Sequence, residues 1–441
     1  MTNTISRRRL LAGAAGLGSA ALLAACGKDS ESKNTGNDTG AVTLNVWGGV
    51  PPESGPDALF AAFTAKHPNI KVKYTRYVND DQGNLKLDTA LQGGLEIDVV
   101  VSYARSALAK RVEAGLLTDL TDRIAGDATL KAFAPGAEPA SNNFFDGKAY
   151  SVPASRSVET VLANKSLLDK AGITVPEDWT AADFRAIAKE LSGKDVYGCL
   201  TPPDLARQRL GPDFTYKAGG RESNFDDPAF RENFQLRLDM MAEKSAVPMT
   251  EIVAQKWDAF AQTPFLTGRV GMWISQPFVL RYIKDTKEYP HDFQTILLPL
   301  PAPQKGVPFW NTGGYGDNVA ITKKSAHQDA AFTLLQFWLG EGAARMVPGG
   351  RLPSLPGGDT AVLAADLGGP DAAKLFDERS LVTNLLTSDA RIPVDTIQTA
   401  HAEIATIMNG LNQRVLLGSI SLDEWARTAK QQCDAAIKKV G

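Results

Sequence analysis

Aromatic side chains stand close in sequence to glycine and polar residues at several points of the chain. Aromatic rings cover the apolar C–H faces of a ligand, whereas hydroxyl, amide, carboxylate and guanidinium groups pair with its hydroxyl groups. This combination suits a polyhydroxylated ring such as a sugar, and such a site rejects analogues that lack a hydroxyl group. The candidate binding residues are Trp47, Gly48, Asp98, Ser102, Tyr103, Arg105, Trp273, Ser275, Trp310, Asn311, Gly314, Tyr315 and Arg351.

Each candidate also has a purely structural explanation. Trp47 can be an ordinary core residue, Tyr103 can lie on a surface turn, and Asp98 stands within its predicted strand. The aromatic and glycine residues of segment 309–316 suit a loop whose backbone approaches a ligand closely. The same composition suits a chain crossing, where glycine relieves crowding. Glu159 is a weaker candidate near the first expected crossing.

Sequence motifs of catalysis are missing from the chain beyond residue 26. It contains no Gly-x-Ser-x-Gly, no His-Glu-x-x-His and no phosphate-binding glycine loop. Its 4 histidines are scattered and lack metal-ligand spacing. Carboxylates are plentiful, so a carboxylate pair for glycoside cleavage is not excluded by counting. We assign no catalytic residue, metal or cofactor, and a secreted glycan-cleaving enzyme remains the rival hypothesis.

An alternation of strands and helices is predicted to position the first candidates. Residues 42–47 and 70–74 alternate apolar with polar side chains, and residues 97–101 form an apolar run. Helical segments stand between these strands, which implies crossover connections and a largely parallel sheet. Ligands bind such sheets at the carboxyl ends of the strands. Segments 47–49 and 102–105 follow the first and third strands and are therefore expected at that edge.

Size and composition limit the remaining possibilities. A chain of 441 residues with 43% hydrophobic residues is too long for one ordinary core and suggests two lobes. The formal net charge of −3 does not favour binding to nucleic acid. Cys199 and Cys433 are either a disulfide pair or two buried thiols.

The first 26 residues resemble a bacterial lipoprotein signal. Three arginines at positions 7–9 precede an uncharged apolar run over residues 10–25. This run is shorter than the roughly 20 residues of a membrane span, so we expect residues 1–25 to be a signal peptide removed on export. Leu-Ala-Ala-Cys, ending at Cys26, resembles the motif in which cysteine is acylated, for example with palmitate; a plain signal with a chance cysteine is the alternative. The arginines also resemble a twin-arginine signal, and the choice between that route and Sec stays open. Residues 26–40 are predicted to be a flexible tether.

Several segments resemble, in the same order, the extracellular solute-binding proteins of family 1, which include maltose-binding-protein-like sugar-binding subunits of ABC importers. The order and spacing of these segments across nearly the whole chain carry the resemblance, because no single motif is decisive. One departure is Ile97, where the family usually has proline before the aspartate. The similar segments are 44–47, 63–72, 94–100, 164–179, 266–273 and 313–323.

The resemblance implies an α/β, two-lobe periplasmic-binding-protein-like fold of type II with hinge crossings between the lobes. The crossings are expected near residues 151–156, 311–317 and 349–354. The first lobe would combine residues 41–152 with 317–348, and the second would combine 153–316 with 349–441.

The function that the resemblance implies is that of a lipid-anchored, extracytoplasmic subunit of an ABC importer. It would bind a mono- or oligosaccharide between the lobes and deliver it to the permease, as a monomer on the outer face of the membrane. Other solutes of the family, namely polyamines, glycerol phosphate and iron, remain alternatives.

Overall fold

The computed structural model describes residues 41–135 and 144–440. The predicted signal peptide, the tether and Cys26 lie outside these residues. Within the described residues, no helix is both long enough and apolar enough to cross a membrane.

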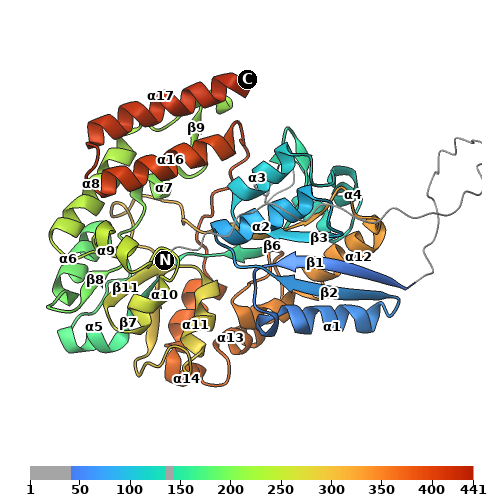
Figure 1. The fold of residues 1–441 in the computed structure, drawn as a ribbon. Coiled ribbons are helices and arrows are strands. Elements are labelled where there is room, and N and C mark those ends of the chain that lie inside the picture. Colours follow the sequence, from blue (N-terminus) through green and yellow to red (C-terminus); the bar gives the residue numbers. More distant parts are fainter. Residues whose placement is uncertain (1–40, 136–143, 441) are drawn as a thin grey trace, which may run out of the picture. The chain divides into compact units, whose positions relative to one another are not determined.

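The first sheet has five strands in the order β2-β1-β3-β13-β6. Strands β1, β2, β3 and β6 of this sheet are labelled in Figure 1. β1 pairs in parallel with β2 and β3, as the strand–helix alternation predicts. β13 pairs antiparallel with both β3 and β6, so the sheet is mixed. The strands are β1 (Val42–Gly48), β2 (Ile70–Arg76), β3 (Val99–Ser102), β6 (Val152–Ser157) and β13 (Gly314–Ile321).

Both faces of the first sheet are buried. Leu44 and Val46 pack into one hydrophobic cluster, whereas Trp47 packs into another with Val100 and Ala320. Burial on two faces explains the nearly continuous apolar sequence of β3. The helices and short elements of this region are η1 (Pro52–Ser54), α1 (Pro56–Lys66), α2 (Asp81–Gln92), α3 (Arg105–Glu113), α4 (Thr121–Ala125), η2 (Leu130–Phe133), β4 (Phe144–Phe145), β5 (Lys148–Ala149), α12 (Gln328–Leu339) and η6 (Ala343–Gly349).

The second sheet has four strands in the order β12-β7-β11-β8. β7 pairs antiparallel with β12 and β11, and β11 pairs in parallel with β8. The strands are β7 (Thr160–Asn164), β8 (Tyr197–Cys199), β11 (Val270–Ser275) and β12 (Thr295–Leu298).

Helices and short elements surround this sheet. The Thr180 hydroxyl accepts a hydrogen bond from Asp183 N, and the Asp183 carboxylate accepts one from Thr180 N at 2.8 Å, so α6 begins with a complete capping box. The elements are α5 (Lys165–Ala171), α6 (Ala181–Leu191), α7 (Leu205–Leu210), η3 (Gly211–Asp213), α8 (Pro228–Ala242), α9 (Met249–Ala254), α10 (Gln262–Leu266), η5 (Pro277–Val279), α11 (Leu280–Lys284), α13 (Thr360–Gly368), α14 (Ala372–Leu375), α15 (Glu378–Leu381) and η7 (Val382–Leu386).

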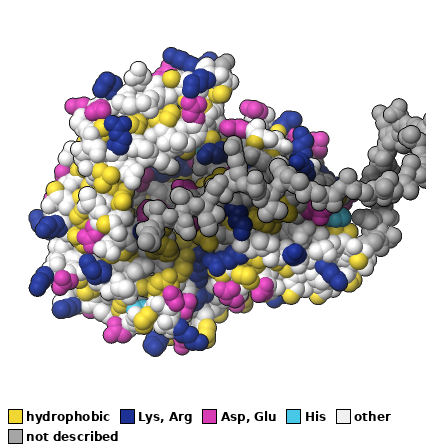
Figure 2. Space-filling view, in the orientation of Figure 1, with side chains coloured by type: hydrophobic (Ala, Val, Ile, Leu, Met, Phe, Trp, Pro, Cys, Tyr) yellow, Lys and Arg dark blue, Asp and Glu magenta, His cyan; other side chains and the backbone are white. Residues whose placement is uncertain are grey.

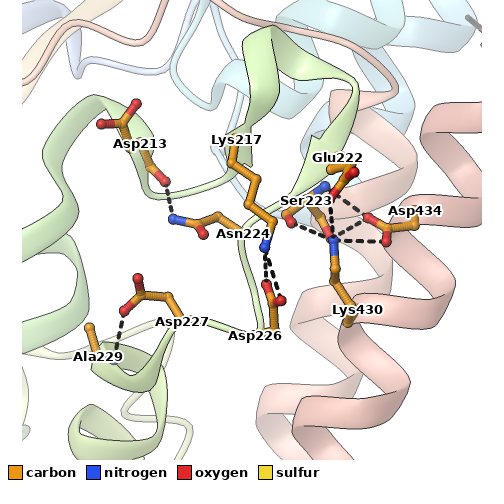
Figure 3. Close-up of polar contacts among 10 residues, drawn as sticks. All are labelled: Asp213, Lys217, Glu222, Ser223, Asn224, Asp226, Asp227, Ala229, Lys430 and Asp434. Carbon is orange, nitrogen blue, oxygen red and sulfur yellow. Dashed lines mark hydrogen bonds and ion pairs between the residues drawn. The ribbon is translucent and has the colours of Figure 1, made fainter.

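The C-terminal helices α16 (His401–Leu416) and α17 (Leu422–Val440) pack in one cluster with α8. The short strands β9 (Tyr216–Lys217) and β10 (Glu222–Ser223), with η4 (Ala218–Gly220) between them, join this cluster. Lys430 of α17 donates to Ser223 O at 2.9 Å and pairs with Asp434 at 2.8 Å (Figure 3). These polar contacts hold the β9–β10 hairpin against α17.

The cysteines of the described chain are free. Cys199 lies in the hydrophobic cluster between the second sheet and α6, whereas Cys433 lies in the α8–α16–α17 cluster. Of the two possibilities that the sequence leaves open, the structure has the buried thiols.

The chain segments that connect the two sheets contact one another. Arg156 N donates to Leu352 O at 3.0 Å, and Gly314 pairs with Ser157. Asn311 Nδ2 donates to the Glu159 carbonyl at 2.9 Å. Strands β6 and β13 both belong to the first sheet, so the lobe boundaries expected after residues 152 and 316 fall within these strands rather than at their ends.

Candidate ligand-binding site

A cavity of about 870 Å³ is lined by residues from the surroundings of both sheets. Figure 2 shows one face of the molecule, on which basic, acidic and hydrophobic side chains are interspersed. The aromatic residues that line the cavity are Tyr103, Phe214, Phe260, Phe278, Tyr282, Tyr289 and Tyr315. Its charged residues are Arg76, Arg105, Arg207, Arg281, Arg351, Asp204, Asp317 and Asp395.

One side, which we call the first-sheet wall, consists of Gly49, Tyr103 and residues 313–318. Gly49 N donates to the Tyr103 hydroxyl at 2.6 Å, which links the segments after β1 and β3. These are the carboxyl ends of parallel strands, where a ligand crevice is expected. Burial raises the pKa of the Tyr103 phenol well above its usual range. Tyr103 therefore stays neutral and keeps a proton to donate to a ligand.

Strand β13 gives the first-sheet wall a charged pair and an acceptor without a partner. Asp317 has a φ of 50°, which is uncommon for a residue other than glycine. Its carboxylate accepts a hydrogen bond from Arg351 Nε at 2.7 Å. The neighbouring Asn318 Oδ1 is buried and has no hydrogen-bond partner within residues 41–135 and 144–440. A buried acceptor without a donor is costly, so Asn318 is suited to receive a proton donor from a ligand.

The opposite side, which we call the second-sheet wall, consists of Phe214, Phe278, Arg281, Tyr282 and Tyr289. The rings of Tyr282 and Tyr289 are nearly perpendicular, with centroids 5.8 Å apart. Gln262 Nε2 donates to the Tyr289 hydroxyl at 3.0 Å and fixes that ring. This wall therefore offers mainly ring surfaces and a guanidinium group.

At the cavity, an ion-pair cluster joins α3, α7 and the irregular segment that contains Asp395. The Asp395 carboxylate pairs with Arg105, at the start of α3, at 2.7 Å and with Arg207 of α7 at the same distance. Burial opposes ionisation of Asp395, but the two guanidinium groups outweigh this effect and lower its pKa.

His401, at the start of α16, also lines the cavity. Burial, together with the positive charge of Arg105, lowers the pKa of His401 to about 4. The imidazole is therefore neutral at pH 7. Among residues 41–135 and 144–440, no three histidine, cysteine, aspartate or glutamate side chains are grouped as metal ligands.

The structure brings part of the sequence-predicted set together. The predicted residues that line the cavity are Tyr103, Arg105, Gly314, Tyr315 and Arg351. The predicted residues that do not line it are Trp47, Gly48, Asp98, Ser102, Trp273, Ser275, Trp310 and Asn311.

The two buried tryptophans of the second group are core residues. Trp47 is 8% exposed and Trp273 is 5% exposed. The Trp273 ring packs against Phe265 with centroids 5.9 Å apart. In both strands the tryptophan alternates with other buried side chains, because helices cover both faces of each sheet. The structural explanation therefore accounts for both residues.

Three polar residues that were predicted for the site, but do not line the cavity, form hydrogen bonds within the protein. Asp98 accepts from Asn45 N at 2.8 Å and from Ser325 Oγ at 2.5 Å. Ser102 accepts from Arg111 Nη1 at 2.6 Å. Asn311 Oδ1 accepts from Glu159 N at 2.9 Å, so its side chain fastens a crossing segment.

The other three residues of that group are also explained by local packing. The centroid of the Trp310 ring lies 4.0 Å from the guanidinium carbon of Arg391. Gly48 permits the close approach of Tyr74, whose hydroxyl would lie 2.7 Å from an added Cβ. Ser275 is buried in β11, where it pairs with Thr160.

None of the five residues of the second-sheet wall is among the residues predicted from the sequence. Phe214 and Tyr289 stand in irregular segments whose neighbours show no periodicity. Phe278, Arg281 and Tyr282 follow β11, so their place after a strand that carries candidate residues is a signal that could have found them.

The two sheets and the adjacent crossing segments define a two-lobe, periplasmic-binding-protein-like α/β fold. The family model described as "Bacterial extracellular solute-binding protein" matches residues 49–345. The chain belongs to this family, whose members bind solutes outside the cytoplasm.

Individual proteins agree with this assignment. An uncharacterized lipoprotein of Streptomyces antibioticus is 26% identical over 64% of this chain and 62% of its own length. An ABC substrate-binding protein from Listeria monocytogenes, solved with cycloalternan, is 21% identical with a TM-score of 0.71 over 90% of this chain and 98% of that one. The GacH receptor of Streptomyces glaucescens, solved unliganded and with acarbose, is 21% identical with a TM-score of 0.69 over 91% of this chain and 100% of that one. At these identities the solved structures establish the fold.

Proposed function

We propose that this protein is the carbohydrate-binding subunit of an ABC importer and that the cavity is its sugar site. The observation that carries this proposal is the convergence of seven aromatic side chains on one cavity that also contains hydrogen-bonding groups. The ring faces would cover the C–H faces of a sugar, and Asn318 and Tyr103 would pair with its hydroxyl groups. The ligands of the Listeria and Streptomyces glaucescens proteins, cycloalternan and acarbose, agree with this chemistry.

The charges of the cavity argue against a polyamine. A polyamine site needs clustered carboxylates, whereas five arginines face three aspartates here. Asp395 and Asp317 are already paired with arginines. A polycation would meet repulsion rather than attraction in this cavity.

A binding screen tests the proposed function. The full-length protein is unfolded thermally with mono- and oligosaccharides, polyamines and ferric iron, because a ligand at about a hundred times its Kd adds roughly 2.7 kcal/mol to stability. We expect a shift with one sugar class and recovery of the sugar unchanged. A shift only with polyamine or iron would overturn the carbohydrate assignment, and a shortened oligosaccharide would establish the enzyme.

We further propose that Cys26 carries the lipid that holds the protein on the outer face of the membrane. Its surrounding motif and the lipoprotein of Streptomyces antibioticus support this. Cells that express the full chain are labelled with palmitate. We expect Cys26→Ala to lose the label and Cys199→Ala, a buried thiol, to keep it. Labelling of the Cys26→Ala variant would contradict the proposal.

Delivery to a permease follows from the same proposal. Ligand would favour a closed arrangement of the lobes, since only a difference in affinity between two states can shift their populations. Uptake of the labelled sugar identified in the screen should fall when the gene for this chain is deleted, and it should return with the full chain. Undiminished uptake would separate the binding protein from that importer.

A further inference from the structure

Positive side chains outnumber negative ones around the cavity. Of the residues that the structure describes, five arginines and three aspartates line it. Arg105 and Arg207 share the Asp395 carboxylate, and Arg351 pairs with Asp317. These three arginines therefore have carboxylate partners within the protein.

Arg281 differs from these three arginines. Its Nη2 donates to the Tyr282 hydroxyl at 2.7 Å, which is a neutral partner. Its Nε and Nη1 are buried and have no hydrogen-bond partner among the residues that the structure describes. Buried guanidinium nitrogens without an acceptor are costly, so Nε and Nη1 are suited to a partner supplied from outside the chain.

The surroundings of Arg281 strengthen this requirement. Its guanidinium carbon lies 4.7 Å from the Tyr282 ring centroid and 5.7 Å from the Phe278 ring centroid. The Arg351 guanidinium carbon lies 5.3 Å from the same Phe278 ring. Aromatic rings exclude water without neutralising charge, and a charge in such surroundings attracts an anion more strongly than in water.

We propose that the solute is an acidic carbohydrate and that Arg281 binds its carboxylate or phosphate group. This inference rests on the proposed sugar-binding function and names the class of sugar. A guanidinium presents two parallel N–H donors, which match a carboxylate or a phosphate. Because Phe278 and Tyr282 flank Arg281, the sugar ring that carries the anion would lie against these side chains.

Matched probe pairs test the proposal by calorimetric titration of the full-length protein. The carboxylate pair is digalacturonate and its dimethyl ester, and the phosphate pair is glucose 6-phosphate and glucose. The variants are Arg281→Gln, which removes the charge, and Arg281→Lys, which keeps the charge but lacks the two parallel N–H donors. The control is Arg209→Gln, because Arg209 is exposed on α7, pairs with Glu232 and does not line the cavity.

We expect the acidic member of one pair to bind at least about tenfold more tightly than its neutral partner, as for a charge-assisted hydrogen bond. This preference should be lost in Arg281→Gln, reduced in Arg281→Lys and kept in Arg209→Gln. The pair that shows it identifies the anionic group.

Two other outcomes would overturn the proposal in distinguishable ways. Equal binding of acidic and neutral sugars, or an unchanged preference in correctly folded Arg281→Gln, would refute the acidic class and leave the sugar-binding function intact. If no carbohydrate of the probe pairs or of the wider screen binds, both proposals fall together.

Discussion

The two walls of the cavity differ in how far their polar groups are satisfied within the protein. On the first-sheet wall, Tyr103 is bonded to Gly49 and Asp317 to Arg351. On the second-sheet wall, ring faces dominate and Arg281 has atoms without a partner. On the first wall, Tyr103 and Asp317 thus have partners within the protein, and Asn318 Oδ1 is the exception that lacks one among the described residues, whereas the second wall presents mainly ring faces and Arg281 nitrogens that a ligand can use. Substitutions on the first wall should change stability and affinity together, and those on the second should change mainly affinity.

The largest expected effect comes from a residue of the hydrophobic core beside the second sheet, not from a residue of either cavity wall. Trp273→Ala should cost about 3–5 kcal/mol of unfolding free energy, because it leaves a cavity next to Phe265. Urea denaturation measures this, and Trp310→Ala, which removes a less buried ring, should cost less. If Trp273→Ala kept full stability and lost only sugar affinity, Trp273 would belong to the site and the distinction between core and wall would break.

A pH-dependent effect comes second. The pKa of His401, lowered by burial and by Arg105 to about 4, lies below its value in the unfolded chain. Between these values the unfolded state binds more protons, so the folded protein loses stability as the pH falls below about 6.5. His401→Gln should remove about 2 kcal/mol of this loss by pH 4.5.

Urea denaturation at pH 7.5 and pH 4.5 measures the difference for His401→Gln, with His67→Gln as a control on a residue that does not line the cavity. If His401→Gln and the unsubstituted protein lost stability equally on acidification, His401 would not carry the effect.

The second-sheet wall gives the clearest separation of affinity from stability. Tyr282→Ala removes a ring face from the cavity and should weaken binding of the sugar identified in the screen by about tenfold, with a smaller loss of stability than Trp273→Ala because Tyr282 is only partly buried. Tyr197→Ala is the control, because Tyr197 lies on β8 away from the cavity. Calorimetric titration that gives Tyr282→Ala an unaltered affinity would remove this ring from the site.

The smallest expected effect tests the first-sheet wall. Tyr103→Phe deletes the acceptor for Gly49 N and should cost about 1 kcal/mol of stability together with a few-fold loss of affinity. Urea denaturation and titration of the same preparation measure both quantities. A loss of affinity alone would show that the two walls do not differ in the way described.

The difference between the first-sheet wall and the second-sheet wall also explains which site residues could be predicted from the sequence. Strands β1 and β2 are predicted by their alternation of apolar and polar side chains, as in Val42, Leu44 and Val46. Strand β3 is predicted as an apolar run, and its carboxyl end locates Tyr103 and Arg105. Strand periodicity does not report which side of a doubly covered sheet reaches a cavity. For this reason the neighbours of Trp47 predict a binding role for a residue that lies in a hydrophobic cluster.

Other residues of the site could not be predicted from the sequence. Asp395 meets Arg105 across 290 positions of sequence, and Phe214 lies in an irregular segment. Only the packing of distant segments brings these side chains together. The same limit applies to Asn311, whose polar side chain suits a ligand but serves a crossing segment.

The separate positions of Cys199 and Cys433 have a practical consequence. Each thiol is enclosed in its own hydrophobic cluster, and burial raises the pKa of Cys433 to about 12, which suppresses its thiolate. The body of the molecule therefore reaches its native state without an oxidant, a disulfide isomerase or a particular redox potential. Reducing agents in a purification buffer should therefore leave its fold unchanged.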